Sequence, residues 1–106
     1  MPRVEQLNQL LLRELAQTIS REIRLDGVLI TITQVDCSSD LRRAKVFVSV
    51  LPDKYFGTAL KVLRQKTGLC KKSLSKLNLK FMPRLIWQVD PREKKAAELE
   101  EVFKQL

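Results

Sequence analysis

Apolar residues recur at every third or fourth position over the first two dozen residues of the chain. This spacing places them on one face of a helix and predicts a long amphipathic helix over residues 4–24. Asp26 and Gly27 follow, and we expect the helix to end there because glycine commonly adopts the left-handed turn after a helix. The residues of the apolar face are Val4, Leu7, Leu11, Leu15, Ile19 and Ile23.

Two runs rich in β-branched residues come next, at residues 28–35 and 43–51. Apolar and polar residues alternate in the second run, so its alanine and valines share one face of a strand while Lys45, Phe47 and Ser49 share the other. A short polar loop at residues 36–40 joins the two runs, which predicts an antiparallel pair of strands.

Helical spacing returns after Asp53, a candidate N-cap, and places Phe56, Ala59, Leu60 and Leu63 on one side of a helix. Thr67 and Gly68 interrupt this pattern. A second short helix follows, with Cys70, Leu74 and Leu77 facing inward. We therefore expect two short helices that meet at Gly68.

Residues 79–90 predict a third strand, and the proline inside it, Pro83, indicates an edge position or a bulge. Asp90 and Pro91 then have the features of a helix start, which predicts a C-terminal helix. The order is α-β-β-α-α-β followed by that helix. A three-stranded sheet covered by helices makes a two-layer α+β sandwich, which is compatible with a K-homology type of RNA-binding fold.

Positive charge is concentrated in one part of the chain. The sequence has 20 Lys and Arg against 12 Asp and Glu, a net charge of +8. From Lys61 to Arg84 it has no acidic residue, and outside that segment basic and acidic residues are equal in number. Such a local field attracts polyanions, and nucleic acid is the leading candidate. The alternative is a lysine-rich solvated face with no specific partner.

The residue inventory argues against catalysis and metal binding. Histidine is absent, and the two cysteines, Cys37 and Cys70, are far apart, so we expect no enzyme activity, no metal and no cofactor. We expect both cysteines to be small apolar core residues. No stretch approaches the roughly 20 apolar residues of a membrane span, and the amino terminus lacks the pattern of a secretory signal. We therefore expect a cytoplasmic protein.

Three segments carry recognisable patterns, at residues 30–35, 40–49 and 83–90. The second is a strand of the pattern Asp-Leu-x-x-Ala-Lys-Val-aromatic-Val-Ser, and the third has the pattern Pro-x-Leu-x-aromatic-x-x-Asp. In this order and at about this distance they resemble ribosome-binding factor A, a family of small bacterial and organellar assembly factors. The resemblance extends from about residue 3 to residue 90.

The resemblance implies a type II K-homology fold in which a kinked helix pair, marked by Ala-x-Gly, replaces the Gly-x-x-Gly loop that grips RNA in other K-homology domains. This chain has Lys66-Thr67-Gly68 there, with lysine in place of the alanine. The resemblance also implies binding to the small (30S) ribosomal subunit near the 5′ region of its 16S rRNA. The protein would promote late maturation and rRNA processing, then leave before translation.

We expect residues 1–90 to form the RNA-binding domain, acting as a monomer, and residues 91–106 to form a C-terminal helix or partly mobile tail. A ribosome-assembly GTPase is a candidate further partner. The predicted RNA-binding residues are Arg64, Lys66, Gly68, Lys71, Lys72, Lys76, Lys80 and Arg84, with Arg42 and Arg43 as secondary candidates.

Other interpretations stay open at this point. Lys80 and Arg84 could instead prevent an edge strand from pairing with another chain, and Arg42 and Arg43 could simply be solvated loop residues. The few aromatic residues are expected mostly in the core, so base stacking is not expected. The alternative functions are another K-homology-like RNA-binding or ribosomal protein, and an adaptor that docks on a protein through residues 97–106. Binding to an anionic membrane is a more distant alternative.

Overall fold

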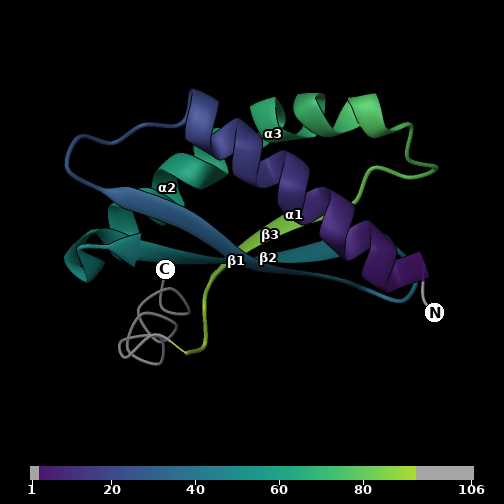
Figure 1. Cartoon of the computed structure of the whole chain (residues 1–106), viewed down its shortest axis with the longest axis horizontal. Helices are drawn as coiled ribbons and strands as arrows, with labels where there is room; N and C mark the ends of the chain where they lie inside the picture. The colour runs from purple at the N-terminus through teal and green to yellow at the C-terminus, as the bar shows by residue number, and fades with distance from the viewer. Residues whose placement is uncertain (1–2, 93–106) are drawn as a thin grey trace.

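The computed structural model describes residues 3–92 and confirms the predicted order of elements (Figure 1). The predicted C-terminal helix lies almost wholly outside the described residues. Two short 3-10 turns, η1 and η2, flank the helix pair. The elements are α1 (Arg3–Glu22), β1 (Leu29–Cys37), β2 (Arg43–Leu51), η1 (Asp53–Tyr55), α2 (Phe56–Gln65), α3 (Thr67–Leu74), η2 (Ser75–Leu77) and β3 (Arg84–Val89).

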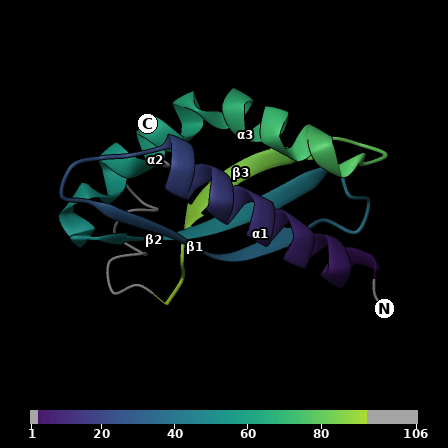
Figure 2. The same cartoon turned by 45° about the horizontal axis from the view of Figure 1, so that its top comes forward.

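The sheet has the order β1-β2-β3, with β2 in the centre. β1 pairs with β2 antiparallel and β3 pairs with β2 parallel, so Val46 of β2 lies between Val35 and Trp87 (Figure 2). The expected edge position of β3 is confirmed. The predicted strand over residues 79–90 is too long, because Pro83 precedes β3 and has no N–H to donate to the ladder.

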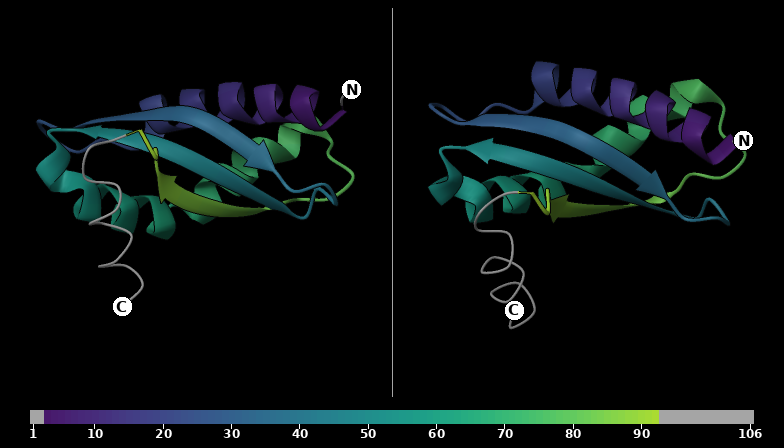
Figure 3. Two further views of the ribbon diagram at one scale, coloured as in Figure 1. Left: turned by 90° about the horizontal axis from the view of Figure 1, so that it is seen from below. Right: turned by 60° about the horizontal axis from the view of Figure 1, so that its bottom comes forward.

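The core lies between one face of the sheet and the three helices, as the predicted two-layer sandwich requires. Figure 3 shows the helices on one side of the sheet, and no helix or strand of residues 3–92 covers the other side, which we call the open side. Val46 and Val48 of β2 have no exposed surface, and neither have Leu11 and Leu15 of α1. Lys45, Phe47 and Ser49 alternate with the buried residues and face the open side.

Two predicted helix ends are wrong in detail. α1 ends at Glu22, and Gly27, with φ of +74°, serves instead in the tight turn that Val28 closes by donating its N–H to the carbonyl of Leu25 at 3.0 Å. Asp53 is not an N-cap. It begins η1, and the N–H of Tyr55 donates to the carbonyl of Pro52 at 3.1 Å, so backbone atoms close the turn before α2.

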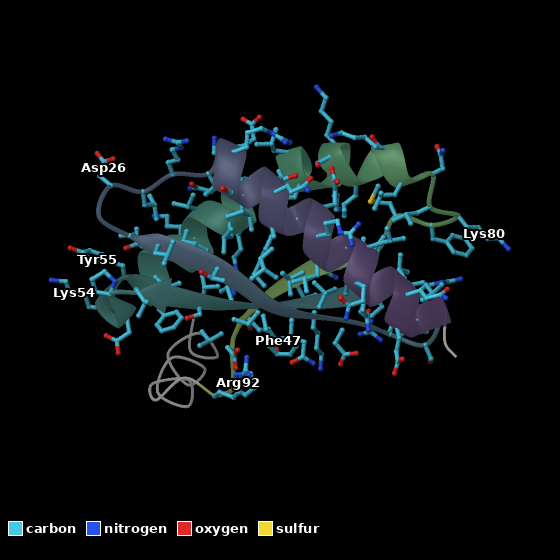
Figure 4. All side chains as sticks on the ribbon, viewed as in Figure 1. Asp26, Phe47, Lys54, Tyr55, Lys80 and Arg92 are labelled. Atoms are coloured by element: carbon cyan, nitrogen blue, oxygen red, sulfur yellow. The ribbon has the colours of Figure 1, made fainter. Side chains whose placement is uncertain are left out.

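Asp90 follows the last residue of β3 and is a buried charged residue, only 4% exposed. Its N–H donates to the carbonyl of Val48 at 2.9 Å, and its carboxylate accepts hydrogen bonds from the N–H and the Nη2 of Arg92 at 2.8 and 2.6 Å (Figure 4). The Arg92 side chain, helped by a hydrogen bond from Thr33, holds the pKa of Asp90 far below its usual range even though burial opposes this. The buried charge is thereby compensated.

We expect Asp90→Asn to lower the free energy of unfolding at pH 7 by about 1–3 kcal/mol, because the ion pair with Arg92 is lost. The folded-state pKa of Asp90 is depressed, so its contribution is complete above the ordinary value of 3.8 and is lost as the pH falls further. Urea titrations at pH 7 and at about pH 2 should show the difference between the two proteins shrinking. Asp26→Asn, at an exposed turn, is the control, and an equal difference at both pH values would contradict the prediction.

Candidate nucleic-acid interface

The sequence predicted a bend between α2 and α3 at Gly68, but the bend lies at Lys66. Lys66 has φ −97° and ψ 10°, and its N–H contacts the carbonyls of Val62 and Leu63 at 2.9 and 3.2 Å. These contacts tighten the last turn of α2 and end it. Gly68 is the second residue of α3, and its φ is not positive. A Cβ on Gly68 would meet nothing within 4 Å.

A threonine ties this bend to the sheet. The Thr67 hydroxyl donates to the carbonyl of Leu63 at 3.0 Å, and it accepts a hydrogen bond from the indole Nε1 of Trp87 at 2.9 Å. Trp87 is a buried residue of β3. One side chain therefore holds the end of α2, the start of α3 and the edge strand together. No local pattern in the chain indicates this contact, because the two residues are 20 positions apart.

The buried side of α3 consists of Cys70, Ser73 and Leu74, which leaves its lysines on the outside. Lys72 and Lys76 are exposed and Lys71 is half-buried on the flank, as the helical spacing predicts. Arg64 and Lys66 are exposed at the bend. We call these five basic residues, which follow one another along α2, α3 and η2, the helical basic surface. Its members are Arg64, Lys66, Lys71, Lys72 and Lys76.

A groove of about 400 Å³ separates α3 from the second half of α1. Lys72 and Lys76 line it on one side, and Arg21 of α1 lines it on the other. The Ser75 hydroxyl also lines the groove. Arg21 lies outside the acid-free segment, so the charge pattern along the chain could not identify it. The Ser75 hydroxyl already donates to the carbonyl of Lys72, so the three cations are the groups suited to phosphate oxygens.

Two acidic residues of α1 partly neutralise the cations of this groove. Glu22 lines the groove, and its Oε1 lies 3.6 Å from Arg21 Nε. Glu14 contacts Lys76. Ser73 Oγ donates to Glu14 Oε1 at 2.9 Å, and Lys76 Nζ lies 3.3 Å from the same oxygen. The Thr18 hydroxyl donates to the carbonyl of Glu14 at 3.0 Å and lies 2.6 Å from the Ser73 hydroxyl. The hydrogen bond from Ser73, together with Lys76, lowers the pKa of Glu14 against the effect of burial. Glu14 is therefore ionised at neutral pH and competes for Lys76.

The other predicted residues lie elsewhere. Arg43 and Arg84 are direct partners across β2 and β3, and the N–H of Arg84 donates to the carbonyl of Arg42 at 2.8 Å. Ala44 and Leu85, the next residues on each strand, face the helices, so Arg43 and Arg84 face the open side. Lys80 is in the loop before β3. The structure thus divides the predicted cations between the helical layer, the sheet and this loop, and does not gather them into one patch.

Both cysteines are buried and free, as expected. Burial raises the pKa of Cys70 to about 11, so its thiol is protonated at neutral pH and unreactive. Within residues 3–92 no group of three His, Cys, Asp or Glu side chains is placed to hold a metal ion. No helix in the same part of the chain is long and apolar enough to cross a membrane.

Comparisons with known proteins agree with one another. The family model for ribosome-binding factor A matches residues 3–103. The chain is 32% identical to ribosome-binding factor A of Natranaerobius thermophilus, over 98% of this chain and 82% of that protein. It is 29% identical to ribosome-binding factor A of Akkermansia muciniphila, over 92% and 78%.

A solved structure supports the fold independently. The crystal structure of ribosome-binding factor A from Thermus thermophilus matches with a TM-score of 0.72 and 24% identity, covering 83% of this chain and 97% of that chain. At this level of identity the likeness shows the shared fold, which is K-homology-like.

We expect Gly68→Ala to leave the fold intact and to raise the free energy of unfolding by about 0.5–1 kcal/mol, because alanine favours a helix interior and nothing obstructs its Cβ. Thermal and urea unfolding measure the change. Gly27→Ala is the matched control and should destabilise, because φ of +74° disfavours a side chain. A destabilised Gly68→Ala protein would show that the bend does depend on this glycine.

Proposed function

The chain belongs to the ribosome-binding factor A family of ribosome assembly factors, and from this premise we propose that it binds the small (30S) ribosomal subunit and promotes late maturation of its 16S rRNA. In this proposal residues 1–90 bind the RNA as a monomer in the cytoplasm, near its 5′ region. Binding assists rRNA processing, and the protein leaves before translation. A ribosome-assembly GTPase is the further partner that we expect.

The groove between α1 and α3 is the observation that carries the proposal. Lys72, Lys76 and Arg21 surround it, and the remaining cations of the helical basic surface lie along the same pair of helices. Lysine and arginine side chains that contact phosphates release counterions and position a protein on RNA, without reading its sequence. This arrangement favours recognition of folded rRNA by its backbone.

Binding alone can account for an effect on maturation. A protein shifts an equilibrium between two RNA conformations only by the difference in its affinity for them. The cations of this surface are held on helices that pack against the core, so their spacing is fixed before RNA arrives. An rRNA conformation whose phosphates match that spacing is stabilised over one whose phosphates do not. The proposal assigns no chemical step to the chain.

The first test replaces Lys71, Lys72 and Lys76 with alanine. If about six phosphates are neutralised, the logarithm of the affinity for small subunits should fall with the logarithm of salt concentration with a slope of roughly −4 to −5. The triple variant should flatten that slope by about two to three, because three phosphate contacts are lost. Binding titrations with purified small subunits at several salt concentrations measure the slope.

The comparison variant replaces Arg42, Arg43 and Arg84 with alanine, which removes the same charge from the sheet and from the loop before β2. An unchanged slope in the lysine variant would remove the helical basic surface from the footprint. Sedimentation in a ribosome gradient separates this function from that of a structural ribosomal protein. An assembly factor should move with free small subunits and their precursors, and a ribosomal protein should persist in translating ribosomes.

The second test concerns Glu14, which shares Lys76 with any bound phosphate. We expect Glu14→Gln to tighten binding to small subunits by roughly two- to fivefold, because Lys76 no longer has to break an ion pair with Glu14 before it contacts RNA. Glutamine keeps an oxygen that can accept the Ser73 hydrogen bond, so the contact between α1 and α3 survives. Asp26→Asn removes an equal charge at a distant turn and is the control. A gain that persists when Lys76 is also replaced by alanine would contradict this explanation.

A further inference from the structure

Phe81 is an aromatic side chain outside the core. Phe56 and Trp87 are buried, as expected of the aromatic residues in this chain, but Phe81 is 51% exposed. It stands in the loop between η2 and β3, and Lys80 Nζ lies 5.7 Å from the centre of its ring. This placement departs from the expectation that the aromatic residues take no part in binding.

The ring borders an apolar groove. Lys80, the residue before Phe81, lies at the end of the molecule where α1 begins (Figure 4). The volume of the groove is about 440 Å³. Leu7 and Leu10 of α1 line it, together with Leu41 from the loop between β1 and β2 and Leu79 from the loop after η2. Leu10 is an exposed leucine, so the apolar surface is open to solvent.

Polar groups at the groove are few. Gln6, Asn78 and Lys80 contribute two side-chain amides and one ammonium group, and no acidic residue among residues 3–92 lines the groove. Asn78 has a left-handed backbone, with φ of 53°, and it ends η2 immediately after the last residues of the helical basic surface. Residues 78–81 of this groove therefore follow Lys76 closely in sequence, but they lie in the loop before β3 and line a separate groove.

We propose that this groove holds one unpaired nucleobase of ribosomal RNA, stacked on Phe81, with Lys80 at the adjoining phosphate. An aromatic face, an apolar floor, amides that can reach a base edge and a cation without a neighbouring acid together match the chemistry of a nucleotide. The inference rests on the proposed function and deepens it, since it adds a contact to the base to contacts with phosphates.

The groove gives the protein a preference that phosphate contacts alone cannot give. A base in a helical stem has both faces covered by its neighbours, so only an unpaired base can stack on Phe81. The helical basic surface would accept single-stranded and double-stranded RNA alike. The groove would favour RNA in which a segment beside the footprint has not yet formed its stem.

The test compares wild-type protein with Phe81→Ala on three fluorescein-labelled probes: a single-stranded RNA octanucleotide, the same strand annealed to its complement, and an abasic strand of equal length. Loss of one stacked base should weaken binding to the single strand by about five- to 150-fold. Affinity for the duplex and for the abasic strand should stay the same. Fluorescence anisotropy measures the three affinities, and Phe81→Tyr should keep the wild-type preference.

Tyr55 supplies a matched control. It is 37% exposed, it follows a lysine, and Lys54 Nζ lies 5.2 Å from the centre of its ring. Figure 4 places Tyr55 at the opposite end of the molecule from Lys80. Tyr55→Ala should leave all three affinities unchanged. Because Phe81 and Tyr55 are both exposed, we expect both variants to fold, and thermal unfolding verifies this.

Two results would overturn the inference. One is an equal loss of affinity for the single strand and the abasic strand in Phe81→Ala. The other is unchanged binding of every RNA probe with weakened association to small subunits, which would mean that the groove takes a protein segment. The salt slope separates this failure from failure of the proposed function, because Phe81→Ala should leave the slope unchanged and the triple lysine variant should not.

Discussion

The crossover from β2 to β3 determines where the cations of the protein lie. Parallel neighbours cannot be joined by a tight turn, so the chain must cross one face of the sheet between them, and α2 and α3 are that connection. Their apolar sides cover Val46 and Trp87 in the core. Their outer sides carry most of the basic residues of the acid-free segment, and these sides must face solvent because the inner sides pack on the core. Burial of the sheet thus produces the helical basic surface.

Contacts between α1 and α3 add a second level of organisation. Ser73 is buried in the helix contact and bonds both Thr18 and Glu14, which keeps the two helices in register. The same Glu14 carboxylate forms an ion pair with Lys76 and offsets its positive field while no RNA is bound. A cation that has a protein partner in the free state is held in place, and it exchanges that partner for a phosphate on binding. Structure and electrostatics are coupled through one carboxylate.

The sequence predicted what repeats locally and missed what depends on distant contacts. The bounds of β2 follow from a strict alternation whose valines are all buried. β3 is shorter than predicted, because Pro83 has no N–H to donate to the ladder, and Leu79 and Phe81 before it border a groove. Arg21 and Glu14, the partner of Lys76, could not be predicted as parts of the site, because both lie on α1, far from α3 in sequence. Glu14 and Ser73, for example, are 59 positions apart. Basic residues of the acid-free segment also lie in different parts of the structure: Arg84 faces the open side of the sheet, and Lys72 lines the groove between α1 and α3.

The double role of the Thr67 hydroxyl has a consequence for how a complex forms. Because this hydroxyl joins α2 and β3 at the start of α3, the bend cannot open or close without breaking a hydrogen bond to a buried tryptophan. This hydrogen bond holds the bend in one arrangement, so in the proposed complex the bend itself loses little conformational freedom and more of the loss falls on the RNA strand. The association rate should then depend on how often the RNA adopts the conformation that fits the protein surface.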